Sequence, residues 1–205
     1  MPSSIGRPLR VSDDDARGLG LSPMAYSYIA GVLDHARAAV AITCPTVNSY
    51  KRMGVGAPNS GSTWAPAYVS YGPNNRTQML RVPEGGRVEN RGCDGAANPY
   101  LALTAVLASG MDGIDRGLDP GDPNVDNLYA LTEAEIAARG IRTMPPTLMH
   151  ATAELIKDDV LRAALGPGRD GGDYIDYFAK VKREEFAAYH AEVTRWETDR
   201  YLTLF

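Results

Sequence analysis

Residues 67–91 read AYVSYGPNNRTQMLRVPEGGRVENR, and they contain three short stretches with the alternation that is typical of β-strands. The three stretches are 67–71, 77–82 and 87–91. The segments between them, 72–75 and 83–86, carry the glycine, proline and asparagine residues that favour turns. The pattern predicts a short antiparallel sheet.

Helical patterns lie on both sides of this sheet. Ser22 is a capping residue followed by proline at the first helical position, and apolar residues then recur at helical spacing until Pro45 ends the helix. Asn98 and Pro99 begin a second helix by the same logic. The body of that second helix is apolar nearly all round, so we expect it to lie in the core.

Further helices are predicted near 132–139, 147–165 and 173–198. A helix, then a sheet, then more helices is the order typical of one α+β domain. The sequence therefore predicts a polar N-terminal arm over residues 1–20 and a domain over residues 21–205, with the short sheet flanked by helices.

The charge balance excludes several classes of protein. Lys and Arg number 21 against 25 Asp and Glu, so the chain is no polycation and no nucleic-acid partner is expected. No apolar run approaches the roughly 20 residues of a membrane-spanning helix, so no membrane contact is expected. The N-terminal stretch lacks the apolar centre of a signal peptide, which predicts a cytoplasmic protein.

Cysteines and histidines are few. Cys44 and Cys93 cannot build a disulfide framework and neither lies in a C-x-x-C motif, so both are predicted to be core or near-core thiols. The three histidines, His35, His150 and His190, are scattered, which argues against a histidine metal cage built by this chain alone. His35 falls away from the apolar face of its helix, so we expect it to be solvated.

The third strand places three charged residues on one face. Side chains alternate along a strand, so Arg87, Glu89 and Arg91 project to the same side. Such a face cannot belong to the core. It is either a solvated outer surface or the floor of a site that binds charged ligands.

The placement of arginine favours a binding site. Five arginines fall within 40 positions: Arg52, Arg76, Arg81, Arg87 and Arg91. A guanidinium fork binds carboxylate and phosphate oxygens in pairs, which a lysine cannot do. Several forks around Glu89 therefore predict a polyanionic ligand and a metal held by that glutamate. Arg76 and Arg81 are an odd number of residues apart, so one of them should lie at a strand end or a bulge.

Five ordered motifs closely resemble the C-terminal half of glutamine synthetase. They are NSYKR at 48–52, NR at 75–76, RVP at 81–83, RVENR at 87–91 and NPYLA at 98–102. The resemblance covers roughly residues 15–205. The glycine-, serine- and proline-rich loop at 54–62 and the STWAP run at 62–66 are most similar to the type III glutamate–ammonia ligase branch, which includes γ-glutamylmethylamide synthetases.

The resemblance implies a role for each arginine. Arg52 and Arg91 match residues that hold the carboxylates of glutamate. Arg76, Arg81 and Arg87 match those that bind the phosphates of ATP. Of these, Arg76 and Arg81 are the expected catalytic residues, because they offset the charge on the phosphoryl group during transfer.

The family also implies a metal and a reaction. Glu89 matches a carboxylate ligand of Mg²⁺ or Mn²⁺ that bridges the phosphates. Glutamate and ATP would form γ-glutamyl phosphate, from which ammonia or a small alkylamine displaces phosphate. The loop at 54–64 would be the flap that excludes water from this intermediate. Family members form homo-oligomeric rings with sites at subunit borders.

One departure from the family concerns the amine. The family places a flap glutamate just before its Ala-Pro pair, whereas Trp64 stands before Ala65 and Pro66 here. An indole face can hold a cation and contact a methyl group, which favours an alkylamine such as methylamine as a substrate. The alternative is a tryptophan that only packs the base of the flap.

A second departure concerns length. Family members are substantially longer, and most of the metal-binding glutamates and a His-x-His motif are expected upstream of Met1. A single carboxylate does not hold Mg²⁺ by itself, so we expect this chain to be inactive if it is the entire product. The alternatives are a non-catalytic structural or interaction piece of the same fold, and a relative that acts on another amine, such as a polyamine.

The segment Asn127-Leu128-Tyr129 is similar to the tyrosine segment that is adenylylated in some bacterial relatives. The next residues, 130–132, depart from that segment. Regulation at Tyr129 is therefore not expected, and a loop tyrosine packed on a helix is the simpler interpretation.

Overall fold

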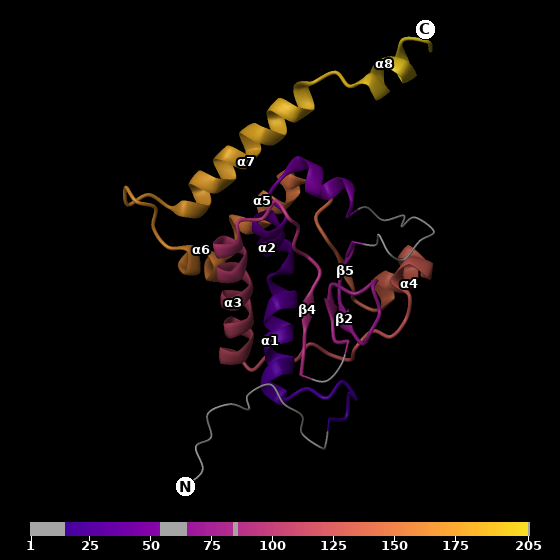
Figure 1. The fold of residues 1–205 in the computed structure, drawn as a ribbon, viewed down its shortest axis with the longest axis vertical. Helices are drawn as coiled ribbons and strands as arrows, with labels where there is room; N and C mark the ends of the chain where they lie inside the picture. Colours follow the sequence, from indigo (N-terminus) through magenta and orange to yellow (C-terminus); the bar gives the residue numbers. More distant parts are fainter. Residues whose placement is uncertain (1–14, 54–64, 84–85, 205) are drawn as a thin grey trace.

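The computed structural model describes residues 15–53, 65–83 and 86–204 (Figure 1). The α-helices are α1 (Pro23–Asp34), α2 (Ala36–Thr43), α3 (Pro99–Asp115), α4 (Glu133–Ala138), α5 (Leu148–Leu155), α6 (Asp159–Leu165), α7 (Tyr174–Ala191) and α8 (Arg195–Tyr201). The 3-10 helices among the described residues are η1 (Val47–Lys51) and η3 (Leu128–Ala130). The strands are β1 (Tyr68–Val69), β2 (Tyr71–Gly72), β3 (Leu80–Arg81), β4 (Glu89–Asn90) and β5 (Arg142–Thr143).

The α+β class is confirmed, with α1 and α3 side by side next to the short strands (Figure 1). Residues 1–14 lie outside the described residues, so the division at residue 20 stays a prediction. No helix among the described residues has both the length and the apolar character needed to cross a bilayer.

The first helix starts as the sequence predicts and then breaks. The Ser22 side chain accepts a hydrogen bond from the Ala25 amide, and Pro23 is the first helical residue. The predicted single helix is divided at His35, which ends α1 and begins α2. The second segment ends at Thr43, ahead of Pro45, as expected.

The strands form two small sheets. Antiparallel pairing is confirmed for β3 and β4, and β1 pairs antiparallel with β5. The predicted antiparallel arrangement is wrong for β2 and β3, which pair in parallel. The reason lies in the connection over 73–79, where Asn75 accepts hydrogen bonds from the amide and hydroxyl of Thr77. This connection returns the chain to the start of β2, so β3 runs in the same direction as β2 and no tight hairpin forms.

The prediction that α3 lies in the core is wrong for one of its faces. Ala102, Ala105 and Ser109 are buried, whereas the face of large apolar residues is exposed, with Tyr100 at 81%. The other exposed residues on that face are Leu103, Leu107 and Met111. Helices α1 and α6 pack against the buried face of α3. Because the sequence of α3 is apolar nearly all round, it does not indicate which of its faces packs against these helices.

The predicted helices in the C-terminal half are also divided. The stretch 147–165 breaks at Asp158, whose side chain caps α6 by accepting from the Leu161 amide. The stretch 173–198 breaks before Thr194, which caps α8. The first half of α7 is anchored in the core by Ile175 and Phe178, whereas α8 buries none of its residues.

Helices α1 and α3 approach each other through glycine. A β-carbon on Gly31 would collide with the Ser109 carbonyl oxygen and with the backbone of Gly113. A β-carbon on Gly113 would collide with the Ser27 carbonyl oxygen. The helix backbones can lie this close only because neither position carries a side chain.

The Gly31→Ala substitution is expected to lower the free energy of unfolding by at least about 2 kcal/mol, because two backbones must separate to admit the methyl group. Urea denaturation measures this loss. Gly95→Ala is the matched control, since a β-carbon at Gly95 meets nothing within 4 Å. Equal stability of the two variants would contradict the packing described here.

Candidate functional site

Arg81 and Glu89 form the centre of the candidate site. They face each other in register across β3 and β4, and Arg81 Nε lies 3.4 Å from Glu89 Oε2. The Arg81 side chain is 16% exposed and that of Glu89 is 42% exposed. Arg81 Nε is buried and makes no hydrogen bond with a described residue. A buried N–H donor of this kind remains available to a bound oxygen.

Arg91 follows Glu89 by two positions, and its guanidinium is held in place. Its Nη1 donates to the backbone carbonyl of Arg76 and lies 3.5 Å from that of Gln78. Burial lowers the pKa of Arg91, and the positive charges of Arg81 and Arg76 lower it further, against the opposing effect of Glu89. These four charged groups therefore lie close enough to interact.

The remaining arginines lie at the surface. Arg76 is exposed in the turn before β3, so the prediction of a non-strand position for one arginine is confirmed. Arg87 is exposed and has no ion pair with a described residue. Arg52 is exposed at the end of η1, and its Nη2 lies 3.6 Å from Cys44 Sγ. Cys44 in turn lies 3.4 Å from the carbonyl of Gly92, next to Arg91.

Tyr129 lies near Arg91. From the sequence, Tyr129 has no expected role in the candidate site and is related only to adenylylation. Its hydroxyl donates to the Ala65 carbonyl, and its ring lies 5.8 Å from that of Tyr68. Burial raises the pKa of Tyr129, and the charge of Arg91 acts in the opposite direction. The Asn127-Leu128-Tyr129 motif is the sequence signal that singles out this tyrosine. Trp64 and the flap at 54–64 lie outside the described residues, so the prediction for them stays a prediction.

The described residues do not by themselves fit a divalent metal. Glu89 is the carboxylate that lies against the arginines, and it is already paired with Arg81. Mg²⁺ requires oxygen ligands in near-octahedral geometry, and one carboxylate supplies too few. Glu89 can therefore contribute a ligand, but this part of the chain does not complete the site.

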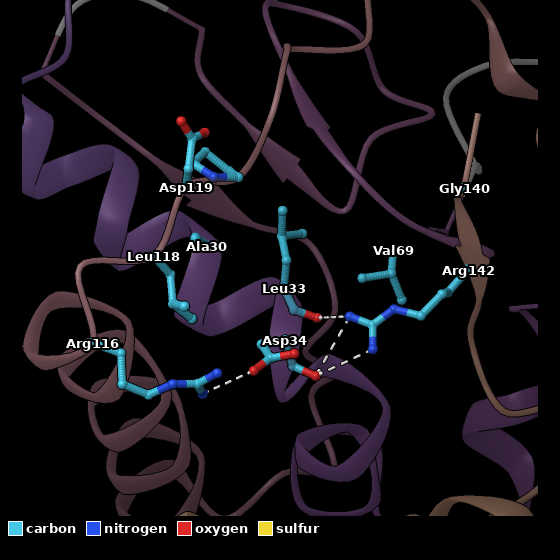
Figure 2. A pocket seen from close by; sticks show the side chains of 10 residues that line it. Ala30, Leu33, Asp34, Val69, Arg116, Leu118, Asp119, Gly140 and Arg142 are labelled. Atoms are coloured by element: carbon cyan, nitrogen blue, oxygen red, sulfur yellow. Dashed lines mark hydrogen bonds and ion pairs between the residues drawn. The ribbon is translucent and has the colours of Figure 1, made fainter.

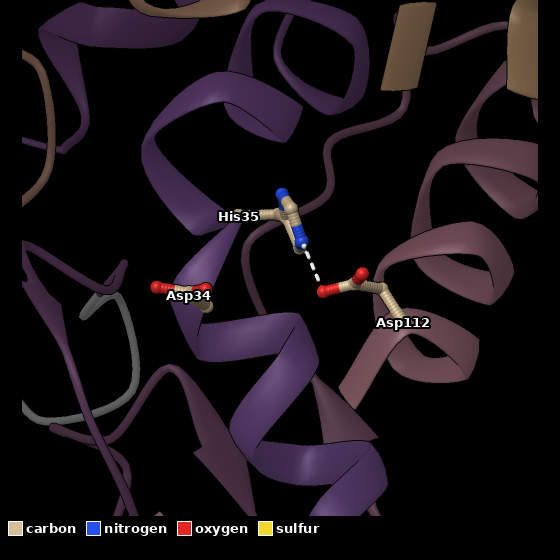
Figure 3. A group of neighbouring side chains, drawn as sticks. All are labelled: Asp34, His35 and Asp112. Atoms are coloured by element: carbon tan, nitrogen blue, oxygen red, sulfur yellow. Dashed lines mark hydrogen bonds and ion pairs between the residues drawn. The ribbon is translucent and has the colours of Figure 1, made fainter. Parts of the chain in front are cut away.

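Aspartates surround His35, which is buried. The prediction that His35 is solvated is therefore wrong. His35 is 9% exposed. Its Nδ1 lies 2.6 Å from Asp158 Oδ2. Its Nε2 lies 3.0 Å from Asp112 Oδ2 (Figure 3). The hydrogen bond to Asp158 is the main cause that raises the pKa of His35 to about 9, against the opposing effect of burial.

This group is an ion-pair cluster. Asp34, His35 and Asp112 could in principle surround a metal. Both ring nitrogens of His35, however, already face carboxylates, and a protonated imidazole cannot be a metal ligand. The cluster connects the α1–α2 junction to α3 and to the start of α6.

The two thiols differ, which corrects the prediction that both are core or near-core. Cys44 is buried and Cys93 is exposed. Burial raises the pKa of Cys44 to about 11. Cys93 also has a raised pKa from partial burial and from the nearby charge of Asp94.

A thiol reagent such as 5,5′-dithiobis-(2-nitrobenzoic acid) is therefore expected to modify Cys93 in the folded protein and to reach Cys44 only on unfolding. Absorbance at fixed pH measures one thiol before denaturant and two after it. The Cys93→Ser variant is the control and should release no chromophore until it unfolds. Rapid modification of Cys44 in the folded variant would contradict its burial.

The sequence profile of the glutamine synthetase catalytic domain matches residues 4–201. The chain belongs to this family. It is 48% identical over 208 residues to the glutamate–methylamine ligase of Methyloversatilis universalis, covering 100% of this chain and 46% of that protein. It is 42% identical over 204 residues to a glutamine synthetase of Halobacterium salinarum, covering 98% of this chain and 42% of that protein.

A solved structure has the same fold. The GmaS–ADP complex in conformation 1 superposes with a TM-score of 0.82 at 41% identity, covering 98% of this chain and 44% of that one. The chain thus spans less than half the length of the relatives that it matches.

Proposed function

We propose that this chain supplies the arginines of an ATP-dependent ligase that joins the γ-carboxylate of glutamate to ammonia or a small alkylamine. The observation that carries the proposal is the pairing of Arg81 with Glu89 across two strands, with Arg91 and Arg76 close by. The similarity to a glutamate–methylamine ligase supports the choice of reaction.

The arginines suit the first half of this reaction. A γ-carboxylate oxygen of glutamate attacks the γ-phosphorus of ATP, the bond to the β-phosphate oxygen breaks, and ADP leaves. Two anions must approach each other, so the positive charges of Arg76 and Arg81 lower the barrier. Arg81 Nε is a buried donor without a hydrogen-bond partner among the described residues, so it can donate to a phosphoryl oxygen. Arg87 would bind the outer phosphates from its exposed position.

The glutamate side rests on Arg91 and Arg52. The Arg91 guanidinium is fixed by backbone carbonyls, which lowers the entropy lost when it clamps a carboxylate. Arg52 contacts Cys44, whose thiol lies against Gly92 on the same segment as Arg91. In the second half-reaction the amine attacks the acyl carbon, phosphate leaves with the electrons of the C–O bond, and the amine loses a proton.

We further propose that the nucleotide binds with Mg²⁺ or Mn²⁺, to which Glu89 contributes one ligand. The metal would neutralise phosphate charge when bound. We also propose a cytoplasmic location. We expect the full-length enzyme to be a homo-oligomer, because family members form rings with sites at subunit borders. Light scattering on the full-length enzyme measures its assembly.

The amine is expected to be methylamine as well as ammonia, since Trp64 replaces the flap glutamate of the family. The initial rates of amide formation with methylamine and with ammonia, at equal free-base concentration in the chimera described below, compare the two amines directly. A strong preference for ammonia would overturn the alkylamine assignment and leave the ligase assignment intact.

The test of the ligase assignment is a chimera in which this chain replaces the matching 46% of the Methyloversatilis universalis ligase. Hydroxylamine traps γ-glutamyl phosphate as the hydroxamate, which is measured by its colour with iron(III). We expect ATP-dependent hydroxamate from the chimera. A folded, assembled chimera that forms none would contradict the proposal.

A second function, a non-catalytic piece of the same fold, is favoured by one observation: among the described residues, Glu89 is the one carboxylate paired with Arg81, and one carboxylate supplies too few ligands for a metal. The hydroxylamine assay on the isolated chain separates the ligase function from the non-catalytic function. Hydroxamate formation by the isolated chain excludes the non-catalytic role. Silence of both chain and chimera supports it.

A further inference from the structure

Two adjoining cavities form one groove on the described part of the chain. They measure about 310 and about 400 Å³ and share Leu33, Val69, Pro120 and Gly140 in their walls. Figure 2 shows the first cavity, between the end of α1, the end of α3, the loop that follows α3, and β5. We call the two together the α1–β5 groove. We call the candidate-site residues Arg52, Arg76, Arg81, Arg87, Glu89 and Arg91 the arginine cluster, and none of them lines the groove.

The first cavity is lined by two arginines and two aspartates, of which Arg142 and Asp34 are the pair considered first. Arg142 Nη2 donates to the Leu33 carbonyl at 2.7 Å and lies 3.5 Å from the carbonyl of Asp34. Arg142 has no ion pair with a described acid. The Asp34 carboxylate accepts from Arg116 through Oδ2 at 3.0 Å, and its Oδ1 accepts no hydrogen bond from a described residue. Arg142 contacts the backbone of Asp34, so the two charges lie near each other (Figure 2).

The second cavity holds an unpartnered buried hydroxyl. Ser70 is 5% exposed, lines the cavity, and its Oγ makes no hydrogen bond with any described residue. Such a group costs about 1–3 kcal/mol when left unsatisfied. The Tyr71 hydroxyl beside it already donates to the Gly121 carbonyl. Ile141 and Pro123 supply apolar parts of the remaining wall, and Asp122, Asn124 and Arg139 supply polar and charged parts.

We propose that the α1–β5 groove binds a free α-amino acid with a short, neutral, hydrogen-bonding side chain. Its carboxylate pairs with the Arg142 guanidinium, and its ammonium pairs with Asp34. Its side-chain amide or hydroxyl bonds Ser70 Oγ in the second cavity. Both cavities lie in the size range, roughly 300–1,000 Å³, of small-molecule sites. A neutral amide or hydroxyl group matches the Ser70 hydroxyl, which can donate one hydrogen bond and accept others.

Isothermal titration calorimetry on the whole chain tests this with L-asparagine and L-glutamine. Succinamate and glutaramate lack the ammonium, and L-leucine and L-homoleucine replace the side-chain amides of asparagine and glutamine with apolar groups of similar shape. We expect at least one of the two amides to bind, and its matching analogues to bind about ten-fold more weakly. Absence of binding by both amides at millimolar concentration overturns the proposal.

Variants locate the binding. Ser70→Ala should weaken it about five-fold, since one hydrogen bond is lost without disturbing an ion pair. Arg142→Lys should weaken it about ten-fold, because the fork is lost while the charge remains. Arg91→Lys and Arg183→Met should leave it unchanged, which separates this groove from the arginine cluster. Should Arg142→Lys fail to fold, Ser70→Ala decides; unaltered affinity in that variant contradicts the site.

Discussion

The Arg81→Met substitution in the chimera is expected to lower the rate of γ-glutamyl hydroxamate formation by about 100- to 1,000-fold, the usual effect of removing one donor to a developing anion. Arg81→Lys should fall between this variant and the parent. A lysine restores the charge but not the planar fork that reaches both Glu89 and a phosphoryl oxygen.

The same variants separate catalysis from stability. The Arg81–Glu89 pair is partly exposed on the glutamate side, so its loss should change the free energy of unfolding by less than about 1 kcal/mol. Arg183→Met on the exposed surface of α7 is the matched control and should keep full activity. Activity of Arg81→Met within about three-fold of the parent, far below the usual effect of a lost oxyanion donor, would remove Arg81 from the reaction.

The His35→Gln substitution is expected to lower the free energy of unfolding by about 3 kcal/mol near pH 6, because it leaves Asp112 and Asp158 without their shared cation. Arg116 also donates to Asp112 and would retain part of that charge compensation. Urea denaturation of the two proteins measures the difference.

The effect of pH has a definite sign. The pKa of His35 rises from 6.5 to about 9 on folding, so its stabilisation is fully present below pH 6.5. It is lost as pH rises through about 9. The stability difference between the parent and His35→Gln should therefore shrink between pH 6 and pH 10. A constant difference over this range would show that His35 is neutral when folded.

Local signals determined where most elements begin. Ser22-Pro23 and Asn98-Pro99 fixed two helix starts because capping and the proline φ angle act within one turn. The spacing of Glu89 and Arg91, and their resemblance to a known motif, predicted a charged face. The register that sets Glu89 opposite Arg81 agrees with that prediction.

Features that depend on distant partners escaped prediction. The break at His35 accompanies contacts with Asp112 and Asp158, which lie 77 and 123 residues away in the chain. The parallel pairing of β2 with β3 depends on a loop that the alternation pattern does not encode. The exposed face of α3 depends on which neighbours pack against it.

The sequence by itself determined the family, the helix starts and the identity of the charged residues, since these depend on residue type and short spacing. Tertiary structure alone decided that Arg76, Arg81, Glu89 and Arg91 interact, that His35 is a buried cation, and that Arg142, Asp34 and Ser70 line one groove. The physical reason is that charge interactions and burial depend on distance in space. Distance in space is set by how the helices and strands pack, across separations that no local pattern records.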